Sequence, residues 1–131
     1  MDLIVTSSVL DLIVREAARA APSECCGILY AERGTVTAAE PAANVADNPR
    51  TRFEIAPQAL IDAHRSSRRG GMSVAGYFHS HPQGPAAPSA TDRTEAAHDR
   101  AIWAIAAGGD VTFWRDDEFG FTPLSYNVVD R

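Results

Sequence analysis

Two histidines, a serine and an aspartate are the residues of this chain whose types and spacing best suit metal chemistry. They lie in the segment FHSHPQGPAAPSATD, which places His79 and His81 two positions apart, followed by Ser89 and Asp92 three positions apart. On a strand, both imidazoles project from the same face, as the two ligands of one zinc ion require. If a helix begins at the serine, Asp92 supplies a third ligand. Three protein ligands leave the fourth tetrahedral position open for water, which is typical of catalytic zinc sites.

Ser89 and Asp92 also have a purely structural explanation. Ser-x-x-Asp at the start of a helix is a variant of the capping box, in which the serine accepts a hydrogen bond from the backbone N–H of residue 92. The carboxylate of Asp92 is also favourable at a helix N-terminus. Neither this cap nor a single histidine indicates a function by itself. A strand with two histidines, a loop and this cap in one segment are much rarer together, and they favour a metal site.

The rest of the chain predicts the elements that position this segment. Ser7 or Ser8 caps a first helix with an apolar face, which Pro22 ends, and Pro57 opens a second helix. Alternating strands and helices predict one α/β or α+β domain over residues 1–131, with a central mixed sheet. Strands are expected at 2–5, 25–31, 35–43, 52–55, 72–81 and 101–106, a hairpin over 111–129, and helices up to Pro22, over 57–69 and over 89–100.

Several other side chains are expected to be structural. Trp103 and Trp114 fall on predicted strands and should belong to the core. His64 and His98 fall on predicted helices, where surface positions are more common than metal-ligating ones. The acidic run from Asp116 to Glu118 is expected to form an exposed turn.

Composition and charge exclude several classes of function. The chain has 131 residues and a net charge of −5, so we expect no general attraction for nucleic acid or for an anionic membrane. We find no signal peptide and no apolar stretch long enough to cross a bilayer. The two cysteines, Cys25 and Cys26, are neighbours and should point to opposite faces of a strand, which disfavours a mutual disulfide. A reducing compartment, and hence the cytoplasm, is expected.

His-x-His, seven residues and Ser-x-x-Asp together resemble the JAMM motif, also called MPN-plus, of JAB-domain zinc metallopeptidases. The seven residues here are 82–88. That family also has a glutamate just before an apolar strand, and PSECCGIL resembles this element, with Glu24 as the glutamate. The segments NVADNPRTRFEIAP and GYFHSHP resemble the small bacterial branch, which includes peptidases acting on sulfur-carrier proteins of the CysO-cysteine type.

The resemblance implies a fold, a site and a reaction. The fold is the JAB/MPN domain, with an architecture like that of cytidine deaminase. One zinc ion per chain is held by His79, His81 and Asp92, while Glu24 takes the proton of the attacking water and Ser89 donates to the developing oxyanion. The substrate is the amide or isopeptide bond after the Gly-Gly tail of a ubiquitin-like β-grasp protein. The choice among sulfur carriers and modifiers, the leaving group and the oligomeric state stay open.

Four alternatives can be compared with these features. Zinc nucleobase deaminases need His-x-Glu and a later Pro-Cys-x-x-Cys, and neither is present. Amidohydrolases carry His-x-His on a barrel of about 250 residues, about twice this length. Cupins carry it on an all-β jelly roll, whereas a predicted loop and helix follow it here. A non-catalytic MPN module that binds other proteins is the main competitor, although such modules typically lack a metal ligand. A cysteine, Cys25 or Cys26, could also close the site as a fourth ligand, but a core position is the simpler expectation.

Overall fold

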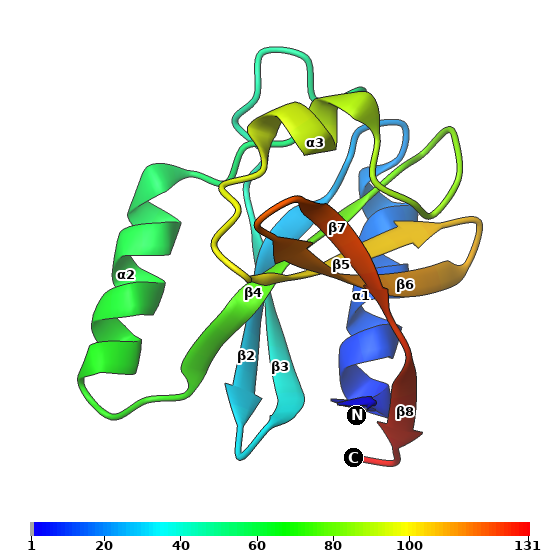
Figure 1. Cartoon of the computed structure of the whole chain (residues 1–131). Helices are drawn as coiled ribbons and strands as arrows, with labels where there is room; N and C mark the ends of the chain where they lie inside the picture. The colour runs from blue at the N-terminus through cyan, green and yellow to red at the C-terminus, as the bar shows by residue number, and fades with distance from the viewer. Residues whose placement is uncertain (1) are drawn as a thin grey trace.

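Eight strands pair into one mixed sheet in the computed structural model, which describes residues 2–131. The order of the strands across the sheet is β7-β6-β5-β4-β2-β3-β1-β8 (Figure 1). The strands are β1 Leu3–Thr6, β2 Cys26–Glu32, β3 Thr35–Ala42, β4 Ser73–Ser80, β5 Ile102–Ala107, β6 Asp110–Asp117, β7 Gly120–Leu124 and β8 Tyr126–Val129, and the helices are α1 Ser7–Ala20, α2 Pro57–Arg68 and α3 Ala90–Glu95.

The pairing of the strands confirms the prediction of a mixed α/β sheet. Strand β4 lies near its centre, antiparallel to β2 on one side and parallel to β5 on the other. The predicted hairpin over 111–129 is correct only for β6 and β7. Strand β8 leaves that hairpin at Ser125 and pairs in parallel with β1 at the opposite end of the sheet. The N- and C-termini therefore lie close together (Figure 1).

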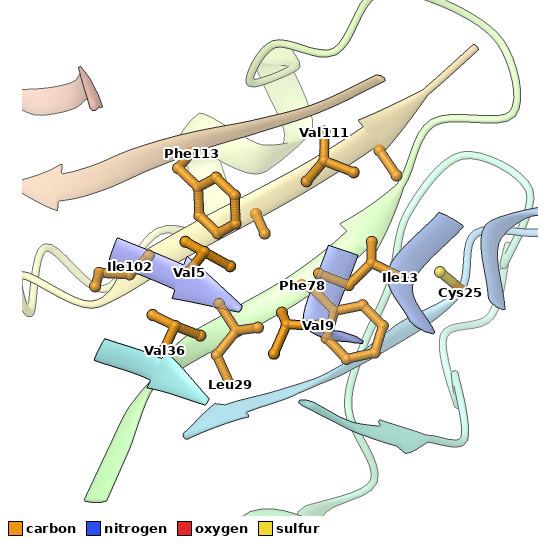
Figure 2. Close-up of a cluster of buried hydrophobic side chains, with 12 residues drawn as sticks. Val5, Val9, Ile13, Cys25, Leu29, Val36, Phe78, Ile102, Val111 and Phe113 are labelled. Carbon is orange, nitrogen blue, oxygen red and sulfur yellow. The ribbon is translucent and has the colours of Figure 1, made fainter. Parts of the chain in front are cut away.

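Helices cover both faces of the central strands, because the side chains of each strand alternate between two apolar clusters. Helix α1 buries Val9 and Ile13 against one face, where they meet Leu29 of β2 and Phe78 of β4 (Figure 2). Helix α2 covers the opposite face and buries Ala63. Figure 1 shows the two helices on opposite sides of β2, β3 and β4, with α3 above the ends of these strands.

The two cysteines follow this alternation. Cys25 packs in the cluster under α1 and Cys26 in the cluster under α2, and both are free thiols. The prediction that neighbouring cysteines face opposite sides and form no mutual disulfide is confirmed.

Some predicted boundaries are wrong for local reasons. The N-cap of α1 is Thr6, whose hydroxyl accepts a hydrogen bond from the backbone N–H of Val9 at 3.4 Å, and not Ser7 or Ser8. The predicted strand at 52–55 makes only one isolated bridge, between Asn44 and Ile55. The side-chain oxygen of Asn44 accepts from the N–H groups of Ala46 and Glu54, which replaces a strand ladder in this loop.

The expected acidic turn is also wrong at its first residue. Asp116 is still on β6 and is fully buried, and its carboxylate accepts a hydrogen bond from the N–H of His98 at 3.0 Å. Helix α3 ends at Glu95, so His98 lies beyond it, with a positive φ of 57°. Of the expected core tryptophans, Trp103 is buried and Trp114 is half-buried. No helix within residues 2–131 is both long and apolar enough to cross a bilayer.

The close approach of β4 and β5 predicts a strong effect of one substitution. A Cβ at Gly76 would lie 1.8 Å from the carbonyl oxygen of Ile102. Gly76→Ala should therefore lower the free energy of unfolding by about 3 kcal/mol, measured by urea denaturation. Gly34→Ala is the matched control, since its Cβ meets nothing within 4 Å and only the φ of +81° is unfavourable. That control should cost about 1 kcal/mol, and equal losses in the two variants would contradict the packing argument.

Candidate metal centre

The end of β4 brings two histidine side chains to the α2 face of the sheet. His79 is fully buried on the strand, and His81 follows its last residue and is 6 % exposed. The backbone N–H of His81 donates to the carbonyl oxygen of Ala106 on β5 at 2.8 Å, so β5 holds this segment in place beyond the end of β4. The alternation of strand residues sends Phe78 to the opposite face.

A complete capping box at the start of α3 fixes Asp92. The hydroxyl of Ser89 accepts from the N–H of Asp92 at 3.0 Å, and the N–H of Ser89 donates to Asp92 Oδ2 at 3.0 Å. Asp92 is only 3 % exposed, so its carboxylate needs these partners. The local sequence thus forms the helix start and orients the carboxylate with the same four residues.

Three atoms of these side chains converge on one point. His79 Nε2, His81 Nε2 and Asp92 Oδ2 lie 3.1 Å from one another along all three sides of a triangle. Tetrahedral ligands bonded to zinc at about 2.0–2.1 Å are about 3.3 Å apart, so the triangle fits one face of such a site. Among residues 2–131 this is the one group of three or more histidine, cysteine or acidic side chains arranged to hold a metal ion.

The surroundings of the two imidazoles suit metal ligation through Nε2. His81 Nδ1 lies 2.8 Å from the carbonyl oxygen of Pro85, which can only accept, so Nδ1 carries a proton and Nε2 is the nitrogen left to bind a metal ion. His79 is held by aromatic rings instead. Phe53 stacks on it with ring centroids 4.3 Å apart, and Trp103 meets it edge to face at 5.5 Å. The buried Nδ1 of His79 has no hydrogen-bond partner.

The electrostatics of the group favour an anionic Asp92 beside neutral imidazole at His79. Burial raises the pKa of Asp92, but hydrogen bonds from His79 and His81 outweigh it and hold that pKa well below its usual range. Burial lowers the pKa of His79 and so favours its neutral form. Burial acts in the same direction on His81, but its contacts with Asp92 and the carbonyl of Pro85 raise its pKa overall.

Glu24 lies on the same face, one residue before Cys25. In the pairing of β2 with β4, Cys26 lies opposite His79, and Cys25 is hydrogen-bonded to Ser80 as the next pair. The pair after that places Glu24 across from His81. Glu24 is 5 % exposed, and its Oε1 is buried without a hydrogen-bond partner. Burial raises its pKa to about 7, against the lowering effect of His81. A carboxyl group with this pKa exchanges protons readily at neutral pH.

Neither cysteine joins this group. Cys26 is on the correct face, but its Sγ lies 3.6 Å from the carbonyl oxygen of Ala42 and 3.7 Å from that of Ala43. Burial raises the pKa of the Cys26 thiol to about 12, which disfavours the thiolate that a zinc ligand must supply. Both cysteines are core residues, whereas the sequence predicts a core position for only one of them.

The fold and the site match a known family. The model of the prokaryotic homologues of the JAB domain matches residues 6–117, which is most of the chain. The chain belongs to this family. The match extends from the N-cap of α1 to the end of β6 and so contains every residue of the metal centre described above.

Relatives of this JAB-domain protein support the same placement. A protein of Haloferax volcanii named "Desampylase" is 36 % identical over 117 residues, covering 86 % of this chain and 84 % of its own. A Thermus thermophilus protein named "Probable TtuB-protein conjugate cleaving protease" is 42 % identical over 78 residues, covering 60 % of this chain and 52 % of its own. The solution structure of a Desulfitobacterium hafniense protein superposes with a TM-score of 0.84 at 25 % identity, covering 98 % of this chain and 93 % of the other.

The family and these relatives establish the enzyme class. This JAB-domain protein is a peptidase of the JAMM type, so the alternative of a non-catalytic scaffold is not needed. The resemblance drawn from the His-x-His segment to the bacterial branch of the family is confirmed.

The structure brings together the side chains that the sequence singled out and adds others. His79, His81 and Asp92 converge, Ser89 caps the helix of Asp92, and Glu24 lies across from His81. Sequence reasoning missed the aromatic rings around His79 and the carbonyl of Pro85. A phenylalanine in a polar loop was the available signal for Phe53, whereas nothing in the sequence indicated which carbonyl would meet His81.

The capping box predicts a stability effect of Ser89 that does not depend on catalysis. Ser89→Ala removes the acceptor of the Asp92 N–H and should lower the free energy of unfolding by about 1 kcal/mol. Ser125→Ala is a suitable control, because Ser125 is exposed and no side-chain hydrogen bond of it is observed within residues 2–131. Urea denaturation of the metal-free proteins measures both changes. An unchanged midpoint for Ser89→Ala would contradict the role of the cap.

Proposed function

We propose that this JAMM-type peptidase is zinc-dependent and hydrolyses the amide or isopeptide bond after the Gly-Gly tail of a ubiquitin-like protein. The observation that carries the proposal is the triangle of His79, His81 and Asp92, with the buried carboxyl group of Glu24 beside it. A relative named for cleaving TtuB-protein conjugates supports a protein conjugate as the substrate class.

The three converging atoms would hold one zinc ion per chain. Two imidazole nitrogens and one carboxylate oxygen are the donor set typical of zinc, and the single triangle accommodates one ion. When bound, zinc would lower the pKa of a water molecule toward about 7 and polarise the carbonyl group of the substrate.

Glu24 would move the proton in this reaction. Its carboxyl group lies on the ligand face and has an oxygen without a protein partner, so it is available to a water molecule there. A pKa of about 7 lets it take a proton from the attacking water and then give it to the leaving amine.

Ser89 would stabilise the charge that develops on the carbonyl oxygen. Its Oγ accepts a hydrogen bond from the N–H of Asp92, which leaves the hydroxyl hydrogen free to donate. The capping box holds this hydroxyl in a fixed position next to Asp92. A preorganised donor of this kind stabilises the transition state more than the ground state.

The burial of the metal centre supports glycines at the cleavage site. The proposed ligands are at most 6 % exposed, so only a narrow segment reaches them. A Cβ or larger side chain beside the scissile bond would collide with the walls, whereas glycine would not. The free, buried cysteines fit a reducing compartment, and we place the activity in the cytoplasm.

Substitutions of Glu24 and His79 should separate catalysis from metal binding. Glu24→Gln keeps the three ligands, so it should retain one zinc per chain and lose about 10²–10⁴-fold in turnover. His79→Ala should lose both zinc and activity. Zinc is measured by elemental analysis of protein purified without chelator, and turnover by cleavage of a tail-extended ubiquitin-like protein.

The control for this pair is Glu118→Gln, an exposed carboxylate in the turn after β6. It should leave zinc content and turnover unchanged. Loss of zinc from Glu24→Gln would make the glutamate a ligand and contradict its role as base. A wild-type protein that neither contains nor takes up zinc would contradict the proposed metal.

Three substrates test the proposed specificity: a sulfur carrier extended by one residue, an isopeptide-linked pair of ubiquitin-like proteins, and an unrelated peptide. We expect the extended sulfur carrier to be cleaved fastest, with products identified by mass spectrometry with and without chelator. A bulky residue in place of its penultimate glycine should abolish cleavage. Faster cleavage of the linked pair would indicate a deconjugating role, and equal slow cleavage of all three would contradict a ubiquitin-like substrate.

A further inference from the structure

A cavity lies next to the candidate metal centre on the α2 side of the sheet. Its volume is about 260 Å³, enough for one long side chain but small for a cofactor. Three aromatic side chains line it: Phe53, Tyr77 and Trp103. Phe53 and Trp103 also contact the ring of His79, so the cavity and the metal centre share a wall.

The remaining polar lining of this cavity is entirely acidic. Glu54, Glu95, Asp99 and Asp116 contribute four carboxyl groups, and no arginine or histidine lines the cavity. Arg52 reaches Glu95 only at 3.9 Å, with about half of each side chain exposed. Such an exposed ion pair is weak, so Glu95 stays available to a cation from outside the protein.

Asp116 is the decisive residue in this lining, because it is 0 % exposed and incompletely satisfied. Its Oδ2 accepts a hydrogen bond from the backbone N–H of His98, whereas its Oδ1 is buried without a hydrogen-bond partner. The Nδ1 of His98 is 3.5 Å from Oδ1, but it bonds to the carbonyl oxygen of Asp117 at 3.0 Å. A buried carboxylate that is incompletely hydrogen-bonded is costly, and a cation in the adjoining cavity would offset part of that cost.

Aromatic faces and carboxylates together are the lining that binds organic cations. The negative face of an aromatic ring attracts ammonium and guanidinium groups, and the carboxylates supply hydrogen-bond acceptors. A bare metal ion does not fit this lining, because these carboxyl groups are not among the metal-holding groups found within residues 2–131.

We propose that this cavity binds the cationic side chain of an arginine or lysine in the protein substrate, close to the scissile amide. The origin of the cation, a side chain of the substrate, rests on the proposed function, whereas the preference for a cation rests on the cavity alone. Phe53 and Trp103, which contact His79 and also line the cavity, would couple the two sites. A segment held at the metal centre would place a neighbouring side chain in the cavity against Phe53 and Trp103, whose rings contact each other edge to face at 5.6 Å.

A pair of small probes tests the preference for a cation without any reaction. The probes are Nα-acetyl-arginine N-methylamide and its citrulline analogue, which has nearly the same shape and no charge. Binding is followed by NMR through the indole N–H of Trp103. The indole of Trp114 serves as the internal reference, since it donates to Thr112 outside the cavity. The arginine probe should shift the Trp103 signal, and the citrulline probe should bind about three- to tenfold more weakly.

Matched double variants distinguish the cavity from the net charge of the protein. Glu54→Gln with Asp99→Asn removes two exposed carboxylates of the cavity and should weaken the arginine probe about three- to tenfold. Glu32→Gln with Glu118→Gln changes the net charge equally at exposed positions outside it and should have no effect. Equal binding of both probes, no shift of Trp103, or equal weakening in the two double variants would overturn the proposal.

Cleavage assays then separate this proposal from the proposed function. A cleaved ubiquitin-like substrate that keeps its Gly-Gly is prepared with arginine or citrulline, in turn, at each position just before the Gly-Gly and just after the scissile amide. At one position, arginine should raise kcat/KM about three- to tenfold over citrulline, and the cavity double variant should remove the difference. Cleavage without any such difference overturns the role of the cavity. Binding of the arginine probe without cleavage of any ubiquitin-like protein overturns the proposed function and leaves the cation preference in place.

Discussion

The register between β2 and β4 is the constraint on which the site depends. Cys26 opposite His79 places Glu24, His79 and His81 on one face of the sheet, and a shift of β4 by one residue against β2 would send both histidines to the core under α1, away from Glu24. Two features fix this register. The hydroxyl of Ser80 accepts from the N–H of Cys25 at 2.8 Å, and the bulky Phe78 fills the opposite face, where a histidine could not pack as well. The apolar cluster and the polar site therefore determine each other's position.

The burial of Asp92 and His81 is compatible with a stable fold because each has specific hydrogen-bond partners. Asp92 is held by the capping box and both imidazoles, and His81 by the carbonyl of Pro85. An uncompensated buried charge would be strongly unfavourable, and a cation between the three atoms offsets the remaining negative charge. The end of β4, the residue that follows it, the loop at Pro85 and the start of α3 supply these atoms.

Much of this arrangement could be predicted from the sequence, since local patterns determine it. The alternation around Phe78 and His79 gives the strand and its two faces, and Ser89 with Asp92 gives the start of α3. Interactions between segments that are distant in the sequence were harder to predict. The capping of α1 by Thr6, the parallel pairing of β8 with β1 and the burial of Asp116 depend on where other elements pack. An acidic run looks like a turn from its composition, and only the position of His98 shows that Asp116 bonds inward.

The pairing of the two terminal strands has a mechanical consequence. Strands β1 and β8 lie parallel, from the pair Leu3–Tyr126 to the pair Thr6–Val129. The chain enters at one end of this ladder and leaves at the other, so a force applied between the N- and C-termini loads its hydrogen bonds together, in shear. Shear along the strands resists extension better than peeling them apart one bond at a time. An unfolding machine that pulls this protein between its two ends would meet its strongest resistance at the first step.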